Sequence, residues 1–430
     1  MPAFLKLLLR NRNYRYTWIG QVISEVGDHF NNIAVFSLVM QMTNSGMAVS
    51  GVLLSRGVAV LAAGPLAGVV IDKLDRRQLM IASDLARTVI AMGFGLCLMY
   101  PKLWILYLFS FLLMFASPFF TVGRSAILPS IASKEELHTA NSLTQTTQWT
   151  TMAIGTMLGG ASVMQFGYEL AFLLNALSFA CSALCISKLA LPGGFAPRVE
   201  ALTEQQVVRP WHDYVEGLRY IRGVPLLMGL TLLTAGWASG GGAAQVLFTL
   251  FGDKVFQRGA AGIGIVWGVA AAGLVVGGAF AHWYGKRIRY ETYLWTVAIC
   301  YVLHGVTYVA FSQMRLFVMA LLFIGMSRAA VGITSVLNTG QLLRHVSDGF
   351  RGRVFSTIES VSWATMMLSM TAAGIASDHY SPRTIGLVSG VLSGSTSIFW
   401  AWAVYKGKLP EPERSGLDPD DVEVHGDPNV

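Results

Sequence analysis

Charged residues are scarce in this sequence. Only 13% of its 430 residues are Asp, Glu, Lys or Arg, whereas 53% are hydrophobic. A water-soluble globule of this length needs more polar surface than that, so the composition excludes a soluble protein and predicts an integral membrane protein. The net charge of +7 is explained by attraction to anionic lipid, and we expect no binding of nucleic acid.

Cysteine and the common catalytic motifs are also scarce. The four cysteines, Cys97, Cys181, Cys185 and Cys300, all lie in apolar stretches, so we expect packing residues and no disulfides. The sequence has no phosphate-binding loop GxxxxGK(S/T) and no HExxH motif, and no two of its eight His residues are four positions apart. These absences argue against ATP hydrolysis and intramembrane hydrolysis. We expect no enzymatic activity, no metal and no cofactor, and we expect a proton gradient to supply the energy.

Long hydrophobic runs, by contrast, are abundant. A membrane-spanning helix needs about 20 apolar residues, and twelve such stretches occur, six on each side of a polar stretch. We therefore predict an all-α membrane protein with twelve transmembrane helices in two pseudo-symmetric six-helix bundles. The expected divisions are a first bundle at 1–191, a cytoplasmic linker with an amphipathic helix at 192–224, a second bundle at 225–408, and a disordered acidic tail at 409–430.

The distribution of Lys and Arg predicts the orientation. If the N-terminus is inside, 22 of these residues fall on the cytoplasmic side and only five on the other: Lys102, Lys254, Arg258, Arg315 and Arg383. Positive residues near span ends are retained in the cytoplasm. We expect a bacterial cytoplasmic membrane protein with both termini inside.

One decapeptide occurs in two related copies, after the second and the eighth apolar stretch. The copies are Gly68-Val-Val-Ile-Asp72-Lys-Leu-Asp-Arg76-Arg77 and Gly278-Ala-Phe-Ala-His282-Trp-Tyr-Gly-Lys286-Arg287. In the first copy, Gly68 would let two helices approach closely and Asp72 could face the positive end of a helix, while Arg76 and Arg77 would hold the loop at the lipid headgroups. The alternative is a relic of duplication that only anchors the chain.

Two six-helix halves with this repeated loop resemble the major facilitator superfamily. The family's loop has the form GxxxD(R/K)xG(R/K)(R/K), which the first copy matches except at Asp75, where Gly is usual. The phrases at 23–28, 216–220 and 352–356 are similar to the macrolide-efflux and enterobactin-exporter branch of drug:proton antiporters. The resemblance implies a secondary transporter, mostly an exporter, in which Asp72 helps to latch the halves in one state. His282, at the Asp position of the second copy, implies a looser contact.

The first span carries the strongest candidates for proton coupling, Asp28 and Glu25. At helical spacing, Gln21, Ser24, Glu25, Asp28, His29, Asn31 and Asn32 share one arc, which we expect to face water. Two carboxylates at i and i+3 in a low-dielectric cavity suit the loading and release of protons. The alternative for both is a structural ion pair with Arg56 or Arg124.

Further buried charges are expected at Arg56, Arg124, Arg328 and Glu359, although Arg124 could instead reach the headgroups. Gly155, Gly159 and Gly160 resemble the antiporter signature GPxxGG, with Thr156 in place of Pro. Small residues at this spacing permit close helix packing.

The substrate cavity is predicted from polar, aromatic and Met residues within the spans. Met and aromatic surfaces adapt to bulky apolar ligands, although the same residues often serve only to pack helices. The candidates are Gln21, Asn32, Gln148, Trp237, Trp363 and Met367. We expect a monomeric, proton-coupled exporter of amphipathic or hydrophobic small molecules such as drugs. The alternatives are a siderophore or lysolipid exporter of the same fold, or a membrane sensor that binds ligand without transporting it.

Overall fold

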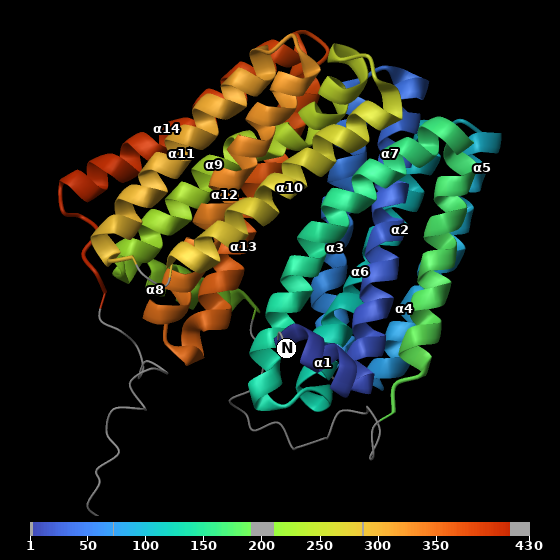
Figure 1. The fold of residues 1–430 in the computed structure, drawn as a ribbon, viewed down its shortest axis with the longest axis horizontal. Helices are drawn as coiled ribbons and strands as arrows, with labels where there is room; N and C mark the ends of the chain where they lie inside the picture. The colour runs from blue at the N-terminus through green and yellow to red at the C-terminus, as the bar shows by residue number, and fades with distance from the viewer. Residues whose placement is uncertain (1–2, 72, 191–209, 286–287, 413–430) are drawn as a thin grey trace, which may run out of the picture.

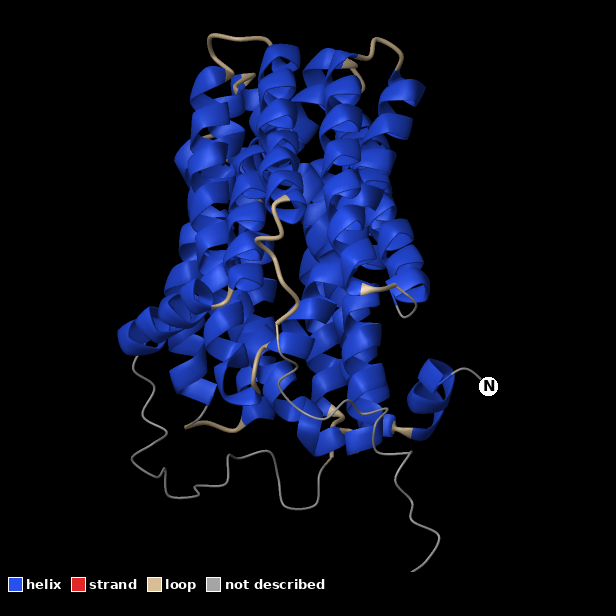
Figure 2. Ribbon diagram, turned by 90° about the vertical axis from the view of Figure 1, so that its left-hand side faces the viewer, coloured by secondary structure: helices blue, strands red, loops and turns tan. Residues whose placement is uncertain are grey.

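The structure is a computed structural model that describes residues 3–71, 73–190, 210–285 and 288–412. The described residues form helices and contain no strand (Figure 2). The first half of the chain forms α1 (Ala3–Arg10), α2 (Arg12–Thr43), α3 (Gly46–Ile71), α4 (Arg76–Gly93), α5 (Gly95–Met99), α6 (Leu103–Ile131) and α7 (Lys134–Ser187). The second half forms α8 (Pro210–Gly223), α9 (Pro225–Leu250), the π-helical turn η2 (Phe251–Val255), α10 (Gly259–Gly285), α11 (Tyr290–Gln313), α12 (Phe317–His345), α13 (Asp348–Ala376) and α14 (Pro382–Tyr405).

These helices make twelve passes through one bundle. Eight helices in the described residues are long and apolar enough to cross a membrane, and α9 joins them when it is taken together with the bent α8. The 54-residue α7 contains two passes, because Gly167 has a φ of +83° and breaks it. α2 and α13 carry more polar and charged residues, as in Glu25, Asp28 and Glu359. The predicted all-α fold of twelve transmembrane helices is confirmed.

Local signals in the sequence fix several helix ends. Asn11 caps α2, since its Oδ1 accepts a hydrogen bond from the backbone N–H of Tyr14 at 3.0 Å. At the other end of α2, Asn44 adopts a left-handed conformation with a φ of 49°. Asp75 caps α4 through a 2.9 Å bond from the N–H of Gln78. The residue that departs from the family's loop pattern is therefore the residue that starts the third pass.

The two halves meet at one end of the bundle. We call the end that carries α1 and α8 the near end, and the opposite end the far end; in Figure 1 the ribbons of α2–α7 and α9–α14 converge at the far end. α7 contacts α10 and α3 contacts α13 across the boundary. Hydrogen bonds join the halves at the far end: Ser50 Oγ donates to Met370 O at 2.8 Å, and Ser45 Oγ donates to Asp378 Oδ1 at 3.2 Å.

Candidate functional site

A polar cluster in the first half is centred on Glu25 of α2. Gln21 Nε2 donates to Glu25 Oε1 and Thr151 Oγ1 donates to Oε2, each at 2.8 Å. Arg124 of α6 lies 3.9 Å from Oε1 through its Nη1. Glu25 thus connects α2, α6 and α7, and its pair with Arg124 is one that the structural alternative named. The polar arc is only partly open to water, because Gln21, Ser24 and Asn31 are buried.

Asp28 lies one turn further along α2 and has no such partners. Its Oδ1 is buried and receives no hydrogen bond from the described residues. Arg56 and Arg87 are the cations that act on it electrostatically, but the ion pairs around it join other residues. Arg56 instead donates from Nη1 to Asn32 Oδ1 at 2.7 Å. Asp28 is therefore the acid of this cluster that is available to a proton or to a mobile ligand.

A second ion pair in this half was not predicted. Asp84 and Arg87 of α4 are both buried and form a direct pair at i and i+3. The guanidinium of Arg87 lies between two rings, 4.7 Å from the centroid of Phe120 and 4.4 Å from that of Phe179. The sequence signal was an acid and a base one turn apart inside an apolar stretch. The charges of Asp84 and Arg87 both act on Asp28.

An aromatic path connects the buried arginines of the two halves. Arg56 lies 5.2 Å above the ring of Phe36, and Arg328 lies 4.9 Å above the ring of Phe248. Between them, Trp267 of α10 stacks on Phe36 at 6.0 Å and meets Phe248 edge-on at 5.2 Å. We call these five residues the aromatic bridge. The Phe36–Trp267 contact crosses the boundary between the halves, so separation of the halves there must break it.

A cavity of 220 Å³ lies between α3 and α13. Its lining includes Gly57 of α3 and Glu359 and Trp363 of α13. Arg56, Arg124 and Arg328 are buried as predicted, but the prediction that Glu359 is a buried charge was wrong, since its side chain is exposed where this cavity opens. Because α3 and α13 belong to different halves, the carboxylate of Glu359 faces the space between the halves.

The predicted substrate-cavity residues do not gather in one place. Trp363 lines the cavity, and Met367 lies beside it, with Sδ 3.5 Å from the position of a Cβ on Gly57. Asn32 and Gln148 are half-buried, and Asn32 is bonded to Arg56. Trp237 packs against the hydrophobic cores of the second half. Gln21 was wrongly predicted to line the cavity: it is 2% exposed, because its amide is directed at Glu25 and the carbonyl of Thr144.

The three glycines of the antiporter-like motif occupy helix crossings. A Cβ on Gly155 would lie 2.9 Å from the Cβ of His29, and one on Gly159 would lie 2.9 Å from the Cα of Phe30, so both face α2. Gly160 faces the other half: its Cβ would lie 2.6 Å from Ala260 O and 3.1 Å from the Cα of Gly264. Close packing at this motif, as predicted, joins α7 both to its own half and to α10.

The repeated loop is only partly described, since Asp72, Lys286 and Arg287 lie outside the described residues. Gly68 was expected at a close helix contact, but no atom lies within 4 Å of the position of a Cβ there. In the second copy Gly278 makes that contact, since a Cβ there would lie 2.7 Å from the ring of Trp149. His282 is exposed. The close approach that was assigned to the first copy therefore belongs to the second.

Arg76 and Arg77 do not simply reach for the headgroups. Arg76 Nη1 donates to Ala126 O of α6 at 3.1 Å. Arg77 donates from Nε to Ile186 O at 3.3 Å and from Nη2 to Ser187 O. These acceptors include carbonyls of the last turn of α7, where a cation is favoured. The two arginines thus connect the start of α4 to the near ends of α6 and α7.

Two of the sequence phrases meet in space at the near end. Glu216 of α8 pairs with Arg353 of α13, with Oε2 and Nη1 2.6 Å apart. The ring of Tyr220 stacks on that of Phe350 at 4.7 Å. A Cβ on Gly217 would lie 2.5 Å from Thr357 Oγ1, so this glycine permits the contact. The predicted amphipathic helix therefore docks on α13, the helix that lines the cavity.

Comparison with known proteins places this architecture. A family model described as Major Facilitator Superfamily matches residues 17–346. The chain belongs to the major facilitator superfamily. Its relatives are transporters, and the protein is a multi-pass membrane transporter of this superfamily.

The sequence relatives of this superfamily member include exporters. It is 26% identical over 410 residues to the uncharacterised MFS-type transporter YfiS of Bacillus subtilis, with 90% of this chain and 92% of the relative covered. Macrolide efflux protein A of Streptococcus pyogenes is 21% identical, with 87% and 92% covered. The enterobactin exporter EntS of Shigella boydii is 28% identical over 291 residues, with 65% and 66% covered. The predicted resemblance to the macrolide-efflux and enterobactin-exporter branch is confirmed.

Solved structures confirm the superfamily fold. A bacterial homologue of the iron transporter ferroportin, in an inward-facing state, superposes with a TM-score of 0.68 at 18% identity, covering 91% of this chain and 99% of that one. The nucleoside transporter NupG superposes with a TM-score of 0.66 at 13% identity, covering 91% and 99%. At these identities the likeness concerns the fold alone.

Proposed function

We propose that this protein exports bulky apolar or amphipathic small molecules from the cytoplasm in exchange for protons. Alternating access, in which one half rocks on the other, carries the substrate. The fold and the exporters among its relatives support transport outward. The protein acts as a monomer that is driven by the proton gradient and needs no cofactor.

One observation carries the coupling proposal: the half-buried Asp28 has a buried Oδ1 that lacks a hydrogen-bond partner in the described structure, and two arginines act on it without pairing directly. A carboxylate in this setting gains a proton or a cationic partner at small structural cost. Protonation of Asp28 weakens its attraction to Arg56 and frees α3 relative to α2. Since α3 also contacts α13, loss of this attraction weakens the contact between the two halves.

The near end faces the cytoplasm in this proposal. The bias of 22 Lys and Arg residues against five supports that orientation. The hydrogen bonds of Ser45 and Ser50 with the second half then close the outer end. The cavity beside Glu359 lies deeper than these contacts, so substrate enters it from inside.

The lining of the cavity favours a substrate that is at least partly apolar. Trp363 and Met367 offer adaptable apolar surface, while the exposed Glu359 supplies one negative charge. This combination suits an amphipathic cation better than an anion. Macrolide export by one relative and enterobactin export by another make a macrolide and a siderophore the two substrates to test first.

The test is substrate-dependent proton movement in proteoliposomes of the full chain. Asp28→Asn should abolish proton flux driven by a macrolide gradient while leaving macrolide binding measurable. Glu216→Gln, which changes an acid of α8 far from the cluster, is the control and should retain coupling. Undiminished flux in Asp28→Asn would remove this residue from the mechanism. Binding of macrolide and enterobactin without transport of either by the wild-type protein would instead identify a sensor.

A further inference from the structure

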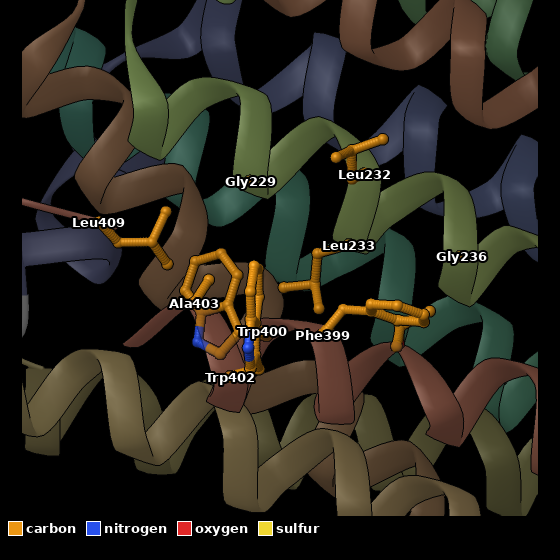
Figure 3. Close-up of a pocket in the computed structure, with 10 residues that line it drawn as sticks. Gly229, Leu232, Leu233, Gly236, Phe399, Trp400, Trp402, Ala403 and Leu409 are labelled. Carbon is orange, nitrogen blue, oxygen red and sulfur yellow. The ribbon is translucent and has the colours of Figure 1, made fainter. Parts of the chain in front are cut away.

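An apolar groove runs along the outer surface of the second half, away from the boundary between the halves. It has a volume of 460 Å³ and lies between α9 and α14. Figure 3 shows Leu233 of α9 and Phe399 and Trp400 of α14 directed into it, with Leu409 at one end. From Gly229 to Gly236, α9 borders it over about 10 Å. This length fits a segment of an extended hydrocarbon chain.

The polar side-chain groups of Trp400 and Thr396 in this lining are already bonded within the protein. Trp400 Nε1 donates to Leu294 O at 2.9 Å, and Thr396 Oγ1 donates to Ser393 O at 2.7 Å. Its rim consists of exposed apolar side chains: Leu232 is 64% exposed and Phe399 is 74% exposed. In a multi-pass membrane protein, such a rim contacts lipid tails. The occupant must therefore be apolar and must arrive from the bilayer.

The near end of the groove is closed by the chain that follows α14. Gly407 has a φ of +61°, which turns the chain back, and the N–H of Lys408 donates to Ala403 O at 2.9 Å. Leu409 is consequently buried at the end of the groove. Tyr290 OH of α11 donates to the carbonyl of Pro410 at 3.2 Å and holds this segment in place. The groove thus has a built floor at the near end.

Two exposed cations stand at that floor. Lys408 Nζ lies 4.2 Å from the ring centroid of Trp402, which itself lines the groove. Lys406 lies over the ring of Tyr405, 5.8 Å from its centroid. Apolar lining that ends at paired cations and a Trp is complementary to a molecule with a hydrocarbon chain and a negative head.

We infer that this groove binds one anionic phospholipid, with an acyl chain between α9 and α14 and its phosphate at Lys408 and Lys406. The inference is independent of the transported substrate, because the groove faces the bilayer and the cavity beside Glu359 faces the other half. A lipid held here bridges the seventh and twelfth passes. It therefore stabilises the second half as a unit.

The test is native mass spectrometry of the purified full chain with dioleoyl phosphatidylglycerol or dioleoyl phosphatidylcholine. The wild-type protein should retain one phosphatidylglycerol about 5- to 30-fold more tightly than phosphatidylcholine, whose choline cation offsets its phosphate, as expected for one or two Lys residues at an anionic headgroup. Ala403→Phe, which fills the groove, should abolish retention of this lipid. Ile398→Phe, at a 67% exposed position of α14 outside the groove lining, is the matched control and should retain it.

A second pair of variants tests the charge. Replacement of both Lys406 and Lys408 by Gln should remove the preference for phosphatidylglycerol, whereas Lys188→Gln, at the near end of the first half, should keep it. Equal retention of both lipids by the wild-type protein would overturn the inference, since it would indicate only annular lipid. Unchanged retention in a correctly folded Ala403→Phe variant would also overturn it. So would a lipid-free dimer that Ala403→Phe dissociates, because the groove would then belong to a second copy.

Discussion

Replacement of Gly160 by Ala should open the far end of the transporter. Gly160 of α7 and Gly264 of α10 cross almost backbone to backbone. An added Cβ on Gly160 would lie 2.6 Å from Ala260 O, whereas ordinary contact begins at 3.4 Å. The obstructing atom belongs to a backbone and cannot rotate away. The two helices must therefore separate, and α7 and α10 belong to different halves.

The size of the effect follows from the cost of overpacking. An extra methyl in a tightly packed contact costs about 1–3 kcal/mol. If separation of the halves at the far end relieves that cost, the equilibrium shifts toward the open far end by roughly 5- to 150-fold. Spin labels at Lys102 and Arg315, exposed residues at the far ends of the two halves, measure this shift in a background that lacks the four cysteines. Gly160→Ala should add a population with a longer distance.

Gly64→Ala provides the matched control. It adds the same methyl to a helix of the first half, but no atom lies within 4 Å of the new Cβ. Its distance distribution should equal that of the parent protein. If Gly160→Ala and Gly64→Ala give the same distribution and the same transport rate, the α7–α10 crossing does not move during transport and the reasoning fails.

Three further predictions concern other contacts described above. Trp267→Ala removes the stacked ring of the aromatic bridge, worth about 0.5–1.5 kcal/mol, so the same spin labels should report more of the open far end. Arg87→Leu leaves Asp84 buried without its cation and should cost about 3–5 kcal/mol; the thermal midpoint should fall and recover when Asp84 is also replaced by Leu. Arg353→Glu should lower the free energy of unfolding by about 0.2–1 kcal/mol, and Glu216→Arg in the same protein should restore the thermal midpoint. A double variant that does not recover its thermal midpoint would contradict the ion pair assigned to it.

The sequence predicted the fold because membrane crossing is a local property. Twelve apolar stretches of sufficient length are enough to define twelve passes. Glycine spacing also predicted that Gly155, Gly159 and Gly160 pack closely. Which helix each one meets could not be predicted, because Gly159 and Gly160 are adjacent in sequence yet contact α2 and α10, respectively.

The candidate site was predicted in part. The arc of α2 correctly gave Glu25 and Asp28 as neighbours, and Arg124 as a possible partner of Glu25. Helical spacing cannot tell a face that contacts water from one that contacts a polar helix, which is why Gln21 was assigned to the cavity.

Contacts between distant segments could not be predicted from the sequence. The aromatic bridge draws its five residues from α2, α3, α9, α10 and α12, so no local pattern reveals it. The partners of the loop arginines could not be predicted for a related reason: the carbonyls that Arg76 and Arg77 contact lie 50 or more residues away. Charge predicts that an arginine stays at the near end, but only the packing of α4, α6 and α7 determines which acceptor it finds.

Gly167 has a practical consequence for work on this protein. The fifth and sixth passes are joined at the far end by this glycine alone, with a φ of +83° that other residues adopt only with strain. An epitope, a fluorescent protein or a nanobody-binding loop inserted here would pull the two limbs of α7 apart. The first limb crosses α10 at Gly160, and the second packs Phe179 against Arg87. An insertion at Gly167 would therefore disrupt both contacts and change the behaviour that it is meant to measure. The exposed turn at Lys102 is the better place for a reporter.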